Sequence, residues 1–105
     1  MSDFDIILED AFDIKGEPAI LMKISSETAE LNIYFKPSEL NRLANFAADQ
    51  NQDYLKIGHA ANNPVHWKRD NETAYILIGA DIDVWDIGFT FNEDLFVKIN
   101  QLLAK

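Results

Sequence analysis

Apolar and acidic side chains alternate along residues 3–14 of the chain. Successive side chains of a β-strand point to opposite faces, so this period of two predicts a strand over residues 4–14 with one buried face and one acidic face. The pattern is set by apolar residues at even positions and carboxylates at odd positions: Phe4, Ile6, Leu8, Phe12 and Ile14, and Asp3, Asp5, Glu9 and Asp13. Asp10 interrupts the apolar series. It indicates either a bulge, which would gather Glu9, Asp10 and Asp13 into one cluster, or an earlier end of the strand.

The remaining periodicities predict several short strands and two helices. Alternating patterns bounded by turn residues place further strands at 18–25, 28–35, 54–59, 65–68, 73–80 and 84–91. Helical spacing of apolar residues predicts one helix that begins near Pro37 and a second that Asn92 caps. Short turns between the first three strands favour an antiparallel meander. We therefore expect an α+β fold of order βββ-α-ββββ-α, a mostly antiparallel sheet with two helices packed on one face, in a single domain over residues 1–105.

Charge and composition narrow the classes of function. The chain has 18 Asp and Glu against 9 Lys and Arg, which gives a formal charge of −9, and it contains no Cys. Such a charge repels nucleic acids and anionic membranes and favours basic partners, although solubility alone also explains an acidic surface. The absence of Cys excludes disulfides and thiol chemistry. The acidic start of the chain and the lack of a long apolar run predict a cytoplasmic protein that does not enter a membrane.

Catalytic signatures are sparse in this sequence. His59 and His66 flank a predicted loop, and a hairpin there would bring the two rings close to each other. A third ligand or an orienting carboxylate would then come from Asp53, Asp70 or Glu72. No His-x-x-x-His spacing supports a metal site, and no Gly-x-Ser-x-Gly turn or Gly-rich loop is present. We therefore expect no enzyme activity and no cofactor. A small metal- or ligand-binding enzyme centred on His59 and His66 is the alternative.

The acidic residues remain the leading candidates for function. Like charges aligned on one strand repel each other, so the arrangement gains nothing for folding and suits a surface that meets a basic partner. The predicted partner-binding residues are Asp3, Asp5, Glu9, Asp10, Asp13, Asp81, Asp83 and Asp86. Tyr34, Tyr54 and Trp67 are candidate aromatic anchors beside these acids, with packing in the sheet as the alternative.

A small, acidic, Cys-free α+β chain of this kind resembles bacterial immunity proteins of contact-dependent growth inhibition and polymorphic toxin systems. The resemblance rests on size, charge and fold class over the whole chain. It implies a non-enzymatic inhibitor that binds and neutralises a cognate basic toxin, often a nuclease, by protein–protein interaction. We expect a monomer or a weak homodimer. An oligomeric adaptor domain that pairs through an edge strand is a further alternative.

Overall fold

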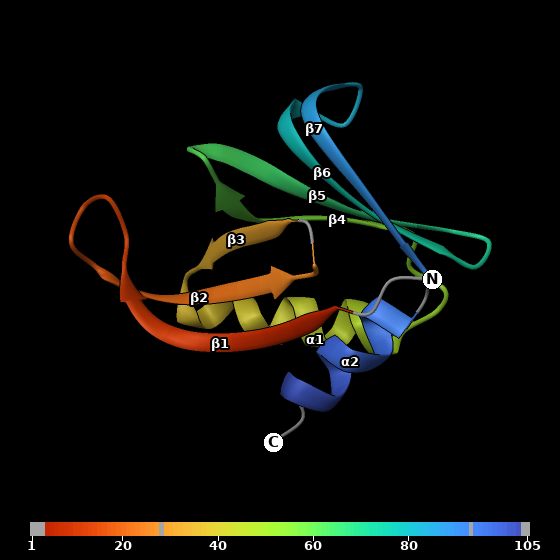
Figure 1. The fold of residues 1–105 in the computed structure, drawn as a ribbon, viewed down its shortest axis with the longest axis horizontal. Helices are drawn as coiled ribbons and strands as arrows, with labels where there is room; N and C mark the ends of the chain where they lie inside the picture. The colour runs from red at the N-terminus through yellow and green to blue at the C-terminus, as the bar shows by residue number, and fades with distance from the viewer. Residues whose placement is uncertain (1–3, 28, 93, 104–105) are drawn as a thin grey trace.

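The computed structural model describes residues 4–27, 29–92 and 94–103, and in this part of the chain it contains one sheet and two α-helices (Figure 1). The strands are β1 (Asp5–Phe12), β2 (Pro18–Ser25), β3 (Glu30–Phe35), β4 (Tyr54–Ala60), β5 (Asn63–Asp70), β6 (Thr73–Asp81) and β7 (Val84–Asn92). The helices are α1 (Leu40–Ala48), which follows the 3₁₀ turn η1 (Pro37–Glu39), and α2 (Asp94–Leu103). The predicted α+β class and the order βββ-α-ββββ-α are confirmed.

The sheet is a meander in which each strand pairs antiparallel with the next, in the order β1-β2-β3-β4-β5-β6-β7. Strands twist, so a sheet of this width curls. The curl brings the start of β1 to the end of β7, where the rings of Phe4 and Phe91 pack edge to face at 5.2 Å. Lys98 of α2 closes this junction, because its Nζ donates a hydrogen bond of 2.8 Å to the Phe4 carbonyl. From this point β1 and β7 diverge, and the β1–β2 and β6–β7 turns lie at separate ends of the protein (Figure 1).

Both helices cover the same face of the sheet, as predicted, and one continuous core fills the space beneath them (Figure 1). The helices contribute Leu43, Phe46 and Ala47 from α1 and Leu95, Phe96 and Ile99 from α2. The strands contribute Met22, Ile24, Leu31, Ile33, Phe35, Ile57, Val65, Trp67, Ile76 and Ile78. Neither described helix is long and apolar enough to cross a membrane. Strand residues that alternate with these core residues point to the opposite face of the sheet, which we call the outer face.

A buried arginine joins the sheet to both helices. Arg69 lies on the inward parity of β5 and is only 7% exposed. Its guanidinium donates to carbonyl oxygens at the end of α1 and in the loop that follows: Phe46, Ala47, Asp49 and Gln52. The carboxyl end of a helix carries the negative end of its dipole, so a cation is favoured there. The guanidinium also lies 4.9 Å from the centre of the Phe46 ring and 4.4 Å from that of Phe96 in α2.

The structure corrects the predicted boundaries around β5. Arg69 lies beyond the predicted strand at 65–68 but belongs to β5, because the strand continues to Asp70. The predicted loop at 60–64 is a tight two-residue turn in which Ala61 and Asn62 have positive φ angles of 51° and 65°. Positive φ at both central residues is the geometry that a two-residue hairpin favours. The register of β4 shifts between Lys56 and His59, and Gly58 takes a φ of 86° at this bulge.

No bulge interrupts β1 at Asp10. The ladder between β1 and β2 is continuous from Asp5 opposite Ser25 to Phe12 opposite Pro18, and Asp10 pairs with Ile20. The strand ends at Phe12, two residues before the predicted end. Asp10 keeps its inward parity but is exposed. It tolerates that position because its carboxylate stays in contact with water.

Replacing the buried cation should destabilise the fold strongly. The substitution Arg69→Met removes the donor to several carbonyls and the contacts with two rings, so we expect the free energy of unfolding to fall by about 3 kcal/mol. Arg42→Met, at an exposed position of α1, is the matched control and should change it by less than about 0.5 kcal/mol. Urea denaturation followed by circular dichroism measures both. A loss below about 1 kcal/mol for Arg69→Met would contradict the role assigned to this residue.

Candidate protein-interaction surfaces

The acidic face of β1 is partly neutralised by its neighbour. Asp5 and Glu9 are exposed on the outer face, as predicted, and the half-exposed Ile7 lies between them. Lys23 of β2 pairs directly opposite Ile7, and its Nζ forms an ion pair of 3.1 Å with Glu9. The hydrogen bond and the charge of Glu9 raise the pKa of Lys23 above its ordinary value. A cation therefore lies in the middle of this acidic face. Asp3, the remaining predicted residue of the face, is outside the described residues.

Glu9, Asp10 and Asp13 do not form the cluster that a bulge would have produced. The continuous register places Glu9 and Asp10 on opposite faces of β1. Asp13 lies beyond the strand, where one carboxylate oxygen accepts hydrogen bonds of 2.9 Å from the backbone N–H groups of Lys15 and Glu17. This is the usual way in which an Asp side chain stabilises a turn. Asp13 thus has a structural role in the β1–β2 turn, whatever its role in binding.

The second predicted group, Asp81, Asp83 and Asp86, surrounds the turn between β6 and β7. All three residues are exposed, and the Asp83 N–H approaches the Asp81 carboxylate at 3.4 Å. Three large apolar side chains are exposed among these acids: Val84 at 64%, Trp85 at 49% and Ile87 at 47%. The turn lies away from the β1–β2 turn (Figure 1), so the structure does not unite the two predicted acidic groups in one surface.

Trp85 lies on a different face from the one that the alternating pattern implies. Alternation places Trp85, Ile87, Phe89 and Phe91 together, and Phe89 and Phe91 do pack against the core. The register between β6 and β7 shifts, however, because Ile78 pairs with Ile87 whereas Gly79 pairs with Trp85. This bulge turns the Trp85 ring onto the outer face, where it lies above Gly88. A groove of about 340 Å³ on this face is lined by Lys68, Asp70, Tyr75, Leu77, Trp85, Gly88, Phe89 and Thr90.

The two histidines have different environments. His66 is 1% exposed on the outer parity of β5, and its Nε2 lies 3.1 Å from the Gly79 carbonyl. A carbonyl only accepts, so Nε2 carries the proton and Nδ1 accepts from the Tyr54 hydroxyl at 2.8 Å. His59 is exposed and pairs across the hairpin with Pro64. Both ring nitrogens of His66 are therefore engaged in the fold. Among the described residues no group of three His, Asp or Glu side chains is placed to hold a metal ion.

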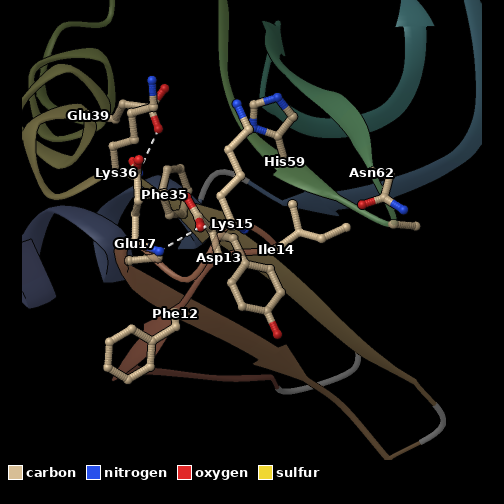
Figure 2. A pocket seen from close by; sticks show the side chains of 13 residues that line it. Phe12, Asp13, Ile14, Lys15, Glu17, Phe35, Lys36, Glu39, His59 and Asn62 are labelled. Atoms are coloured by element: carbon tan, nitrogen blue, oxygen red, sulfur yellow. Dashed lines mark hydrogen bonds between the residues drawn. The ribbon is translucent and has the colours of Figure 1, made fainter.

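A larger groove of about 710 Å³ lies between the β1–β2 turn and the start of the helical segment (Figure 2). Its apolar lining includes Phe12, Ile14 and Tyr34, and its basic lining includes Lys15, Lys36 and His59. Two of its carboxylates are occupied by backbone N–H groups, as the dashed lines of Figure 2 show: Asp13 in the turn, and Glu39, which accepts 2.7 Å from the Lys36 N–H. The groove therefore offers apolar surface with cations at its rim, and Asp13 is the predicted partner-binding residue that lines it.

The predicted aromatic anchors divide into exposed and buried residues. Tyr34 and Tyr54 are partly exposed, whereas Trp67 is fully buried, stacks on Phe35 at 6.2 Å and donates from Nε1 to the Ile57 carbonyl at 3.0 Å. Trp67 is thus a core residue. Trp85, which alternation groups with Ile87, Phe89 and Phe91, is an exposed aromatic residue beside Asp83 and Asp86. The sequence signal for this bulge is the pair of glycines in adjoining strands, Gly79 and Gly88, since glycine inside a strand often marks a bulge or a close approach of two strands.

Comparison with protein-family models, with curated proteins and with solved structures gives no match. The function of the chain must therefore be inferred from its own surfaces.

The link between Tyr54 and Asp81 can be tested by titration. Burial raises the pKa of the Tyr54 phenol, and the nearby Asp81 carboxylate raises it further. Asp81→Asn should lower this pKa toward the ordinary value without reaching it, whereas Asp83→Asn should not change it. The ¹³Cζ NMR shifts of labelled tyrosine, followed against pH, measure each phenol. Because the unfolded chain ionises first, the contribution of Tyr54 to stability is present below about pH 10 and is lost as the pH rises through the folded pKa. An unchanged Tyr54 pKa in Asp81→Asn would contradict the proximity.

Proposed function

We propose that this chain is a non-enzymatic inhibitor that binds a basic protein, in the manner of an immunity protein that neutralises a toxin. The observation that supports this most is a set of exposed carboxylates that no described cation neutralises. Asp5, Asp10, Asp81, Asp83 and Asp86 are exposed, and none forms an ion pair with another described residue. The formal charge of −9 adds a negative electrostatic potential that extends beyond these individual carboxylates.

The electrostatics favour a basic protein over a nucleic acid or an anionic lipid. Unpaired surface carboxylates attract cations and repel phosphates, so they accelerate the encounter with a positively charged surface. The attraction is screened beyond about 8 Å at physiological ionic strength, so the partner's cations must come close to the acids. A toxin that binds nucleic acid carries such a cationic surface, and covering it would block access of the substrate. This is the inhibitory mechanism that we propose.

The histidine-centred alternative has weaker support. A metal or a proton-transfer reaction at His66 would require it to give up hydrogen bonds to Tyr54 and to the Gly79 carbonyl. The ring is also almost fully buried. These contacts explain His66 as part of the outer-face structure of β4, β5 and β6, and they favour the binding function for the chain.

Capture from cells tests the proposal directly. The tagged chain is mixed at low salt with a lysate of the cells that encode it, and stoichiometrically bound proteins are identified by mass spectrometry and assayed for activity. We expect a basic protein whose activity is lost in the complex. A bound protein that is acidic, or that keeps its activity in the complex, would contradict inhibition.

Association kinetics then test the role of the free carboxylates. In the double variant Asp5→Lys and Asp10→Lys, association with the captured protein should be slower by about tenfold at low salt, and the difference should shrink as salt is added. Asp13 is left unchanged because it stabilises the turn. The control Glu27→Lys with Glu72→Lys alters the net charge equally at exposed positions. Equal association rates for the two variants would show that the position of the acids does not matter.

A further inference from the structure

We infer that a basic partner docks on the β6–β7 hairpin, with Trp85 as the anchor and the β1 acids acting only on the rate of encounter. This inference rests on the proposed function and deepens it, because it names the surface and the kind of segment that the surface takes. The occupant is an extended segment of another protein that alternates basic and aliphatic residues.

The hairpin exposes more apolar surface than folding requires. Val84, Trp85 and Ile87 fall within four consecutive residues, and each is about half exposed or more. The register places Trp85 on the outer face, whereas Ile87, opposite the core residue Ile78, keeps the inward parity, so the three side chains crowd one hairpin without sharing one face. Apolar exposure of this extent on a single hairpin is typical of an interaction site. Trp is also the residue type that most often dominates binding energy at protein interfaces.

The position of Trp85 is specified by two glycines. A Cβ at Gly79 would lie 2.3 Å from the Trp85 Cα and 2.6 Å from the Val84 carbonyl oxygen, so only glycine permits this approach of the two strands. A Cβ at Gly88 would lie 2.9 Å from the Trp85 ring and 3.0 Å from Leu77, so glycine also leaves the space that the ring occupies. The ring is therefore held in place before any partner binds. A rigid anchor loses little conformational entropy on binding.

The surroundings of the ring indicate the chemistry of the partner. Tyr75, Leu77 and Trp85 line one groove of about 340 Å³, which suits an aliphatic side chain, and the groove also holds Lys68 together with the carboxylate of Asp70. Asp81, Asp83 and Asp86 lie around the hairpin end and favour Lys or Arg on the incoming segment. β7 is the last strand of the sheet, so an extended segment can follow its edge beside the groove and the acids of the hairpin end.

The other two surfaces fit a basic segment less well. On β1, Lys23 lies opposite Ile7 and pairs with Glu9, so a basic partner would meet a cation in the middle of the acids. At the larger groove, Lys15, Lys36 and His59 accompany three carboxylates, and two of these, Asp13 and Glu39, are engaged by backbone N–H groups. Of the apolar surfaces described, the hairpin is therefore the one best matched to a positively charged occupant.

A designed peptide tests the site without knowledge of the natural partner. The probe is a short, amidated, fluorescein-labelled peptide in which Lys alternates with Ile and Val, and its binding is measured by fluorescence anisotropy at low salt. The same sequence with Glu in place of Lys is the control peptide. Trp67 is buried and Trp85 is half exposed, so protection from acrylamide quenching by an unlabelled copy of the peptide reports on Trp85.

The variants separate the hairpin from the rest of the surface. Trp85→Ala should weaken binding of the Lys peptide at least about tenfold, as should Asp83→Lys combined with Asp86→Lys. Phe12→Ala removes another exposed aromatic residue, and Asp5→Lys with Asp10→Lys makes the same change of charge on β1. Phe12→Ala should alter the dissociation constant by less than about threefold. The β1 charge variant should raise it only through slower association, with an unchanged dissociation rate, whereas the hairpin variants should raise the dissociation rate. Circular dichroism confirms that each variant is folded.

Each outcome decides the inference. Loss of binding in the hairpin variants alone, with Trp85 protected in the native chain, supports it. Equal binding by Trp85→Ala, stronger dependence on the β1 acids, or no binding of the Lys peptide by the native chain overturns the docking site. None of these results alters the capture experiment, which alone decides whether the chain inhibits a basic protein. A failure of that experiment with peptide binding intact would leave a docking surface for basic segments without an inhibitory role.

Discussion

The hydrogen bonds of the buried Arg69 guanidinium hold the sheet and the helices in one arrangement. The residue enters from β5, donates to carbonyls at the carboxyl end of α1, and lies against aromatic rings from both α1 and α2. Burying a cation is costly unless its donors are satisfied, so these carbonyls and the helix layer must be placed together. Since the helices are committed to one face of the sheet, the outer face and the divergent ends of β1 and β7 remain available for binding (Figure 1).

The element order was predictable because the chain obeys simple periods. β3 alternates strictly between exposed and buried residues, and the apolar stripes of α1 and α2 are buried. The failures occur where one contact overrides a local signal. Arg69 falls outside the predicted strand at 65–68 because a charged residue beside Asp70 and Asn71 resembles turn sequence, and only the distant helix end makes its burial favourable. The parity of Trp85 was wrong because a bulge, built around Gly79, lies between it and Ile87.

The sequence predicts the charge of the candidate binding surfaces but not where they lie on the fold. The sequence identifies the acids of β1 and of the β6–β7 turn, but it does not show that Asp13 supports a turn or that Lys23 pairs with Glu9. These contacts join residues in different strands or across a tight turn, so the alternation of residues within one strand cannot predict them. They leave the hairpin, with Asp83, Trp85 and Asp86, as a place where free acids surround an exposed tryptophan.

The indole resonances of the chain give the most direct test of that coincidence. The chain has two tryptophans, and Trp67 is buried with its Nε1–H bonded to the Ile57 carbonyl, whereas Trp85 is exposed on the hairpin. In a ¹H–¹⁵N NMR titration with the captured basic protein, the account predicts that the Trp85 indole and the β7 backbone amides shift first and furthest, while the Trp67 indole stays in place. Shifts centred on β1 and β2, with the Trp85 indole unchanged, would contradict it.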